Sequence, residues 1–317
     1  MGNNRQQTIM KRTLVLVFSL FLGLAAAQAQ QQFATLQHGD SISVFYGMDA
    51  FKNAHNASVN GDIVTLSSGV FNRCTISKAI TIRGAGMFQD TLLHTISPSI
   101  IVESFTINIP QDSVYFLTME GLCCPSRIHV QNAYNPHFVK CYLPDINATE
   151  TQRTMYNAQF LNSIIGFYGS RLPITATNCV IIDDGVLGFS LSAYNCILPK
   201  LDAWQASCTM SLHNCIYIPY RSSYLWTFDC LQMTNNQDST YASVFKEYRG
   251  TFDYNNPVSF ELQDSVAATV LGSDGTQVGI YGGQFPFNPR VVNYKATVAN
   301  QSRPDGKLEV TVQPVNE

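Results

Sequence analysis

The most regular pattern of polar and apolar positions lies between residues 139 and 231. A short phrase recurs there, in which a residue that is usually Asn precedes Cys or Ser and an apolar residue or Tyr follows. The six copies are Val139–Tyr142, Leu161–Ile164, Thr177–Val180, Tyr194–Ile197, His213–Ile216 and Phe228–Leu231. Successive copies lie 15 to 22 residues apart. A constant phrase at a variable interval is typical of a solenoid whose strands are fixed while its loops vary in length.

The third position of this phrase predicts a column of core residues. Equivalent residues in successive coils of a solenoid stack about 4.8 Å apart, which is the spacing of neighbouring strands. Cys is among the most buried side chains, so we interpret the column as a packing device. Its members are Cys141, Ser163, Cys179, Cys196, Cys215 and Cys230. The Asn before each is expected at the outer face of the strand or at a corner.

The redox state of the nine cysteines is left open by their number. An odd count leaves at least one thiol unpaired in a secreted chain, while the remainder could form disulfides. The register of the column favours free buried thiols. Zinc is not predicted, because the chain has no C-x-x-C pair and the adjacent Cys123 and Cys124 point to different sides of a strand.

The N-terminal part of the mature chain predicts a cap followed by a first coil. Residues 48–57 place Met48, Phe51, Ala54 and His55 on one helical face, and the alternating stretch 41–46 reads as an edge strand. A short amphipathic helix would cover the open end of a solenoid. Three short alternating strands then follow between residues 61 and 86, separated by turns.

Two stretches carry a resemblance to a known superfamily. The segment Gly61-Asp62-Ile63-Val64-Thr65-Leu66-Ser67-Ser68-Gly69-Val70-Phe71, with Ile80-Thr81-Ile82-Arg83-Gly84 after it, resembles the opening coil of right-handed parallel β-helix proteins of the pectin-lyase-like superfamily. The stretch from Leu271 to Phe287 is similar to the C-terminal end of secreted bacterial β-helix proteins of largely uncharacterised function. The resemblance implies an all-β, right-handed, single-stranded parallel β-helix with a short N-terminal capping helix. Two alternating stretches, Val291 to Val298 and Lys307 to Val315, predict a small C-terminal β hairpin after it.

The chain divides into five expected segments. Lys11-Arg12, an apolar run and the small-x-small site Ala27-Gln28-Ala29 predict a signal peptide cleaved after Ala29, with either Met1 or Met10 as the start. The protein is therefore expected outside the cytoplasm and is not expected to be an integral membrane protein after cleavage. The segments are 1–29 signal peptide, 30–58 strand and capping helix, 59–240 parallel β-helix, 241–290 closing segment, and 291–317 C-terminal hairpin.

Composition agrees with a sheet protein and argues against nucleic acid as a partner. Hydrophobic residues make up 45% of the chain and charged residues only 13%, about half the usual share. The formal charge is −3 and no basic patch stands out. Polarity comes mainly from Asn, Gln, Ser and Thr.

Catalytic chemistry has little support in the sequence. Enzymes of the superfamily act on acidic polysaccharides, and of the motifs in its polygalacturonase-like members only the Asp-Asp pair has a match in this chain, at Asp183 and Asp184. Inverting hydrolysis needs two carboxyl groups about 6.5–9.5 Å apart, so acids on neighbouring coils would be required. No acidic cluster recurs to hold the calcium of the lyase-like members. No cofactor is predicted, and Asp274 is the one residue considered as a calcium ligand.

A binding ridge is the other candidate site. If the loops keep register, seven residues that follow the phrases would share one ridge, and aromatic faces beside hydrogen-bonding groups suit a sugar-binding groove. They are Tyr168, Asp183, Asp184, Lys200, Asp202, Tyr220 and Arg221. The alternative is that these are ordinary residues at the corner after each strand.

Three functions remain open from the sequence. The favoured one is a non-catalytic extracellular β-helix that binds a polysaccharide or a cell-surface partner. The others are a divergent polysaccharide lyase or glycoside hydrolase acting on acidic polysaccharide, and a purely structural surface or matrix component.

Overall fold

The computed structural model describes residues 32–88, 98–111, 114–147, 154–168, 173–183, 190–202, 209–221, 225–233, 238–247, 257–287, 294–298 and 310–314. The predicted signal peptide lies outside these ranges. Among the helices within them, none has the length and apolar character needed to cross a membrane.

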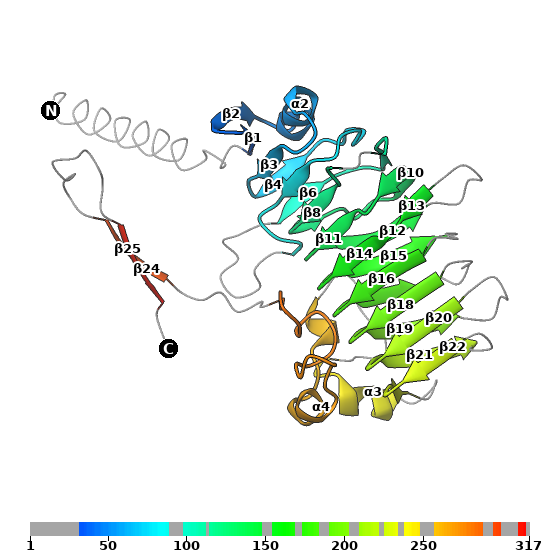
Figure 1. Ribbon diagram of the computed structural model, residues 1–317. Helices are drawn as coiled ribbons and strands as arrows, with labels where there is room; N and C mark the ends of the chain where they lie inside the picture. The colour runs from blue at the N-terminus through cyan, green and yellow to red at the C-terminus, as the bar shows by residue number, and fades with distance from the viewer. Residues whose placement is uncertain are drawn as a thin grey trace, which may run out of the picture.

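The described strands wind into a parallel β-solenoid of about seven turns, as predicted (Figure 1). Sheet A, with 11 strands, runs in the order β2 (Ser41–Tyr46), β1 (Phe33–His38), β3 (Ile63–Leu66), β5 (Thr81–Arg83), β8 (Thr118–Glu120), β11 (His137–Val139), β14 (Ala158–Leu161), β16 (Pro173–Thr177), β18 (Ser190–Tyr194), β20 (Thr209–His213) and β22 (Leu225–Phe228). From β3 onward each strand pairs in parallel with the next.

Sheet B forms a second side of the same coils. Its path contains β4 (Gly69–Phe71), β6 (Ser99–Ile101), β9 (Leu122–Cys123), β12 (Tyr142–Asn147), β15 (Ile164–Tyr168), β17 (Val180–Asp183), β19 (Ile197–Asp202), β21 (Ile216–Arg221) and β23 (Leu231–Gln232). Off this path, β10 (Ile128–Tyr134) pairs in parallel with β7 (Phe105–Asn108) and β13 (Thr154–Tyr156). These three strands give the N-terminal coils a third side.

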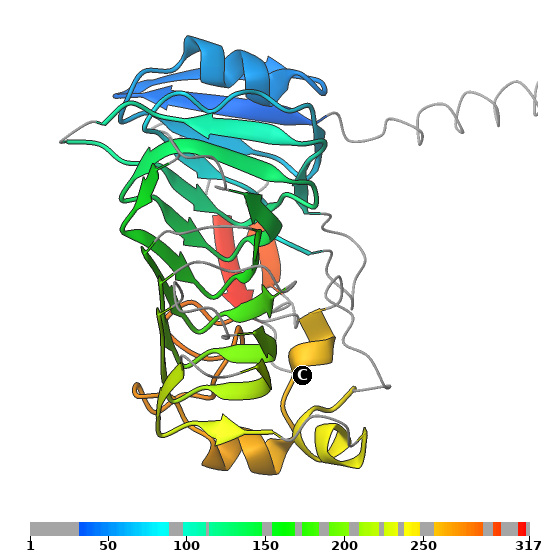
Figure 2. The same ribbon diagram turned by 90° about the vertical axis from the view of Figure 1, so that its right-hand side faces the viewer.

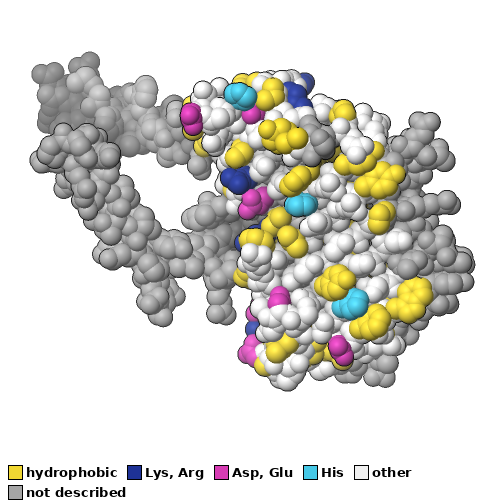
Figure 3. Space-filling model, in the orientation of Figure 1, with side chains coloured by type: hydrophobic (Ala, Val, Ile, Leu, Met, Phe, Trp, Pro, Cys, Tyr) yellow, Lys and Arg dark blue, Asp and Glu magenta, His cyan; other side chains and the backbone are white. Residues whose placement is uncertain are grey.

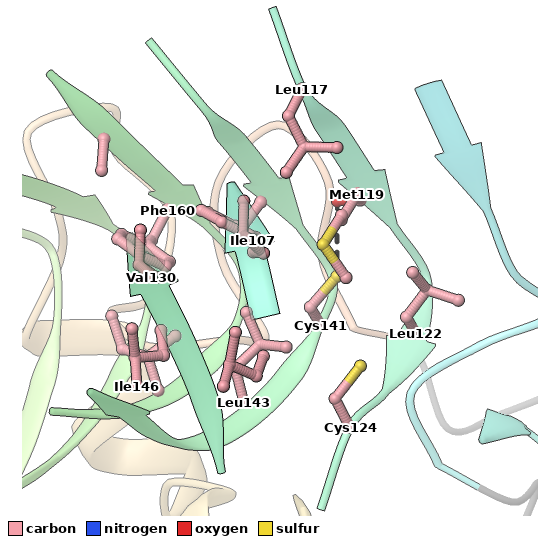
Figure 4. Close-up of a cluster of buried hydrophobic side chains, with 14 of the residues drawn as sticks. Ile107, Leu117, Met119, Leu122, Cys124, Val130, Cys141, Leu143, Ile146 and Phe160 are labelled. Carbon is pink, nitrogen blue, oxygen red and sulfur yellow. Dashed lines mark hydrogen bonds between the residues drawn. The ribbon is translucent and has the colours of Figure 1, made fainter. Parts of the chain in front are cut away.

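The core is built of columns of inward-facing side chains. One column of sheet A passes through Met119, Phe138 and Phe160, which are almost fully buried, and the rings of Phe138 and Phe160 stack 4.8 Å apart. Figure 4 shows Cys141 and Leu143 pointing into the same interior. Identical positions in successive coils therefore pack against one another rather than against loops.

Each coil turns from sheet A to sheet B through one left-handed residue. This residue is the second of the repeated phrase, and Asn162, Asn178, Asn195 and Asn214 have φ between 46° and 56°. Asn tolerates this conformation better than other residues with a side chain. Lys140 and Asp229 take the same conformation in the first and last copies. The Asn that precedes Cys thus makes the corner.

The third position of the phrase lies just past that corner and faces inward. Cys141, Ser163, Cys179, Cys196 and Cys215 are 0% exposed, and Cys230 in the last coil is half-buried. The eight cysteines in the described ranges are free thiols, and Cys208 lies outside those ranges. Each sulfur is also a hydrogen-bond partner: the Cys179 N–H donates to Cys196 Sγ (3.3 Å), and the Cys196 N–H donates to Cys215 Sγ (3.3 Å).

Ser163 makes the same contacts in its coil that the thiols make in theirs. Its Oγ accepts from the Cys141 N–H at 3.0 Å and donates to the Leu161 carbonyl at 2.9 Å. Likewise the Cys196 thiol donates to the Tyr194 carbonyl at 3.1 Å. The column therefore requires a small side chain that can both donate and accept.

The N-terminal cap is larger than the sequence predicted. The expected strand at 41–46 is the second half of a hairpin with β1, and β1 in turn pairs antiparallel with β3. Helix α2 (Ala50–Ala57) buries Phe51, Ala54 and His55, whereas Met48 precedes the helix and is 47% exposed. The prediction that Met48 belongs to the buried helical face was therefore wrong.

Lys78 ties this helix to the first coil. Its Nζ donates to the carbonyls of His55, Asn56 and Ser58 at 2.6–2.8 Å. These carbonyls lie at the C-terminal end of α2, where a cation is favoured by the unpaired carbonyls and the helix dipole.

The closing segment lies along the outside of sheet B, beside the lower coils in Figures 1 and 2. It contains α3 (Asp238–Val244), the 3₁₀ helix η1 (Pro257–Phe260), α4 (Asp264–Thr269) and the turns of residues 270–287. Beyond it, β24 (Tyr294–Val298) and β25 (Val310–Pro314) pair antiparallel as the expected C-terminal hairpin.

Candidate functional site

The predicted ridge lies at the carboxyl ends of the sheet B strands. Tyr168, Asp183, Lys200, Asp202, Tyr220 and Arg221 are placed by their backbones only, and Asp184 lies outside the described residues. In register, Asp202 is adjacent to Arg221, while Asp183 is adjacent to Phe167 rather than to Tyr168. Convergence of these seven side chains into a groove stays a prediction, as does any catalytic role of Asp183 and Asp184.

The outer face of sheet B is buried from β12 to β21. The fourth residue of each phrase points outward, and Tyr142, Ile164, Val180, Ile197 and Ile216 are at most 5% exposed. Val278 and Ile280 of the closing segment, 1% and 0% exposed, belong with them to one hydrophobic cluster. This second core lies outside the coils, so this part of sheet B presents no open surface to a large ligand.

The corner amides hold the closing segment in place. Asn162 Nδ2 donates to the Ile280 carbonyl at 3.1 Å and to the Gly282 carbonyl at 2.6 Å. Two coils further on, the Ser273 N–H donates to Asn195 Oδ1 at 2.9 Å, and the Gly279 N–H donates to the Asn195 carbonyl at 2.7 Å. Asn162, Asn178 and Asn195 are each 2% exposed. Asn162 and Asn195 are thus docking residues as well as corner residues.

The outer face of sheet A is open and, in its C-terminal half, uncharged. Two outward columns cross the strands from β14 to β22 in strict register. The first consists of Gln159, Thr175, Ser192, Ser211 and Trp226, and the second of Leu161, Thr177, Tyr194, His213 and Phe228. All ten side chains are at least partly exposed. Apart from Leu161, the face is therefore an array of hydroxyl, amide and aromatic groups.

An aromatic stack closes the second column. The Tyr194 and His213 rings lie 4.8 Å apart at 15°, and the His213 and Phe228 rings lie 4.5 Å apart at 8°. His213 Nε2 is 2.8 Å from Ser211 Oγ. A histidine flanked by hydrophobic side chains is visible on this face in Figure 3. Only His213 is stacked on both faces, while Phe228 and Trp226 at the end of the two columns are 51% and 53% exposed and offer aromatic surface to solvent.

The sequence contained the signal for this face. Val139, Leu161, Thr177, Tyr194, His213 and Phe228 are the first positions of the six phrases. The third position faces inward where sheet B begins, and the corner residue before it separates it from the first position, which faces outward on sheet A. Aromatic residues at the first position of three successive coils are neighbours in register, so their rings stack. From the sequence alone, only the second and third positions of the phrase were interpreted, so the outward aromatic residues at the first position were not predicted as a site.

Asp274 caps a turn. Its Oδ1 accepts from the Thr276 N–H at 3.0 Å and from the Thr276 hydroxyl at 2.8 Å. Throughout the described part of the chain, no group of three or more His, Cys, Asp or Glu residues could hold a metal ion. The geometry around Asp274 is that of an Asx turn.

Comparison with known proteins adds no relative: no family model, curated protein or solved structure matches this chain.

Proposed function

We propose that this is a secreted, non-catalytic β-helix protein that binds an uncharged glycan along the outer face of sheet A. The observation that carries the proposal is the pair of in-register columns from β14 to β22, which present hydroxyl, amide and aromatic groups without any Asp, Glu, Lys or Arg. Membership of the pectin-lyase-like superfamily and cleavage after Ala29 are part of the same proposal, and rest on the sequence motifs alone.

The spacing of the columns supports a linear ligand. Neighbouring strands are about 4.8 Å apart, similar to the length of one sugar ring in an extended chain. A glycan lying parallel to the solenoid axis would therefore meet one Ser, Thr or Gln per sugar. The apolar face of a sugar would pack on Trp226 at the end of the array, where the indole is 53% exposed.

Binding to an array of neutral and uronic-acid oligosaccharides, followed by calorimetry, tests this function. Trp226→Ala should weaken binding of a neutral oligosaccharide about tenfold, the equivalent of about 1.4 kcal/mol. Thr175→Arg should also weaken it, because a long charged side chain would block the first column. Tyr156→Ala is the matched control, since Tyr156 is 45% exposed but lies on β13, off sheet A.

Two outcomes would overturn the proposal. Equal loss of binding in Tyr156→Ala would show that sheet A is not the binding face. Release of reducing or unsaturated sugar ends that is abolished by Asp183→Ala would instead establish the enzymatic alternative on acidic polysaccharide.

A structural role through self-association is the second candidate, and strand β2 favours it. β2 is an outer edge of sheet A, has no charged residue, and exposes Ile42 by 68%, Val44 by 45% and Tyr46 by 63%. Such an edge is a template for pairing with another strand. Light scattering should then show oligomers of the wild type that the Val44→Lys variant does not form. A wild-type protein that stays monomeric at high concentration would exclude this role.

A further inference from the structure

A polar pocket lies on the third side of the solenoid, away from the outer face of sheet A. It has a volume of about 440 Å³, is open to solvent, and is lined by helix α2, the chain at residues 73–75, strand β7 and strand β10. The polar side chains that line it are Lys52, Arg73, Thr75, Ser104, Thr106 and His129. Its volume lies within the range of small-molecule sites.

The strand register sets the spacing of the donors in the wall. Thr106 of β7 is directly adjacent to His129 of β10 in a parallel pair. Ile76 bridges to Ile107, which brings the preceding residues 73–75 beside β7. Hydroxyl and imidazole groups from three successive segments therefore line one wall.

Positive charge dominates the pocket. Arg73 is fixed at the rim, because its Nη1 donates to the Ser104 carbonyl at 2.8 Å and its Nε lies 3.0 Å from Glu103 Oε2. Lys52 has no ion-pair partner among the described residues. Cys74, which also lines the pocket, is uncharged at neutral pH, since burial raises the pKa of its thiol to about 12. An ammonium group is thus left without a counter-charge.

We propose that this pocket binds a tetrahedral oxyanion, the phosphate or sulfate group of a ligand. Several residues that carry donors line the pocket from different elements: Lys52, Arg73, two threonines, a serine and His129. Such an array can donate hydrogen bonds to three or four oxygens of one group, whereas a planar carboxylate has only two oxygens. Glu103 competes with the anion for Arg73.

The experiment is a titration of the purified protein with inorganic phosphate, inorganic sulfate or acetate, followed by calorimetry and thermal shift at constant ionic strength held with NaCl. Phosphate or sulfate should bind saturably and raise the Tm, and acetate should bind at least about tenfold more weakly. Lys52→Gln should weaken the oxyanion about tenfold, and Glu103→Gln should strengthen it because it removes the competing carboxylate.

Arg83 supplies a matched control for Arg73. Both arginines are about half exposed, and each pairs through Nε with a glutamate, at 3.0 Å for Arg73 and 3.3 Å for Arg83. Only Arg73 lines the pocket. Arg73→Gln should weaken phosphate or sulfate binding, while Arg83→Gln should leave it unchanged.

The proposal is overturned if Lys52→Gln binds phosphate and sulfate as the wild type does, if Glu103→Gln gains nothing, or if acetate binds equally well. Tighter binding of phosphate than of sulfate, or the reverse, would show which of the two groups the ligand carries. Lys52 and Glu103 lie apart from sheet A, so these variants should not change glycan binding. The oxyanion proposal and the proposed function can therefore fail separately.

Discussion

Sheets A and B are wound by the same coils, yet their outer faces differ in the C-terminal coils. On sheet A the outward residues Thr175, Ser192 and Tyr194 reach solvent, whereas on sheet B the outward residues Ile164, Val180 and Ile197 are covered. The closing segment accounts for the difference, because it places Val278, Ile280 and the aromatic residues of η1 and α3 over sheet B. The outside of a solenoid is therefore not uniformly a surface.

The two faces also differ in their sequence pattern. The sheet A strands alternate strictly, as in Ser190–Tyr194 with its buried Leu191 and Ala193. The sheet B stretches are apolar at consecutive positions, as in Cys179–Ile182. A strand with one wet face alternates, while a strand covered on both faces reads as a continuous apolar run. In a repeat protein, the second pattern indicates that something packs on the outside.

The largest expected difference between the faces comes from truncating one outward residue on each in the same coil. Ile197→Ala should lower the free energy of unfolding by about 2–5 kcal/mol, because Ile197 is 1% exposed and packs under the closing segment at Gly279. Tyr194→Ala should cost less, since its ring is stacked on one side only of an exposed face. Urea denaturation of both variants measures this, and equal losses would contradict the two-face comparison.

The corner amides give a finer test of how the closing segment is held. Asn195→Gly keeps the left-handed conformation but removes the acceptor for the Ser273 N–H, so we expect a loss of about 1–3 kcal/mol. Asn214→Gly is the matched change at a corner with a similar φ, 52° against 56° for Asn195, where the side chain is less buried. It should change stability little. A loss in Asn214→Gly as large as in Asn195→Gly would show that the amides contribute only to the corner.

The thiol column tests the interior that both sheets share. Cys196→Ala should cost about 1–2 kcal/mol, because the buried Cys179 N–H loses its acceptor and the Cys196 N–H bond to the next coil is unaffected. Cys196→Ser should cost less than the Ala variant, since Ser163 fills the same role in its own coil. Denaturation under reducing conditions compares the free energies of unfolding of the two variants. A Ser variant less stable than the Ala variant would contradict a hydrogen-bonding role.

Acid should weaken the cap from which both faces start. His55 is 2% exposed, and burial together with Lys78 lowers its pKa from 6.5 to about 4. Its Nε2 already accepts the Ser77 N–H, and no described group partners Nδ1, so a second proton is disfavoured. The unfolded chain takes up that proton below pH 6.5 and the folded chain does not. Stability should therefore fall as the pH drops from about 6.5 to about 4.

The measurement is Tm against pH for the wild type and for His55→Gln, with His129→Gln as a control for the substitution itself. Between about pH 7 and pH 5.5 only part of the effect develops, so this change should be the smallest of the four. A His55→Gln profile as steep as that of the wild type would assign the acid sensitivity to other groups.

Local pattern was enough to predict the solenoid, the capping helix and the inward column from Cys141 to Cys230. The covering of sheet B was not predictable in the same way, because Asn162 binds Ile280, 118 residues further along the chain, and no periodicity links them. The aromatic residues of the outer face could be read at the first position of the phrase, but their outward direction followed only from the left-handed corner residue after them. The predicted ridge depended on loop register, and the one-residue offset between Tyr168 and Asp183 shows how easily that assumption fails.

The row of corner Asn residues leaves open at which coil the closing segment docks. Asn162, Asn178, Asn195 and Asn214 present the same amide once per coil, so a closing segment displaced by one coil would meet nearly identical partners. Only a feature that does not repeat can remove this ambiguity. Tyr142 is the one Tyr at the fourth position of the phrase, and its ring lies 5.1 Å from that of Phe88, which in turn lies 6.1 Å from Phe287. We infer that this aromatic cluster, which forms at one coil only, favours a single position of the closing segment along sheet B.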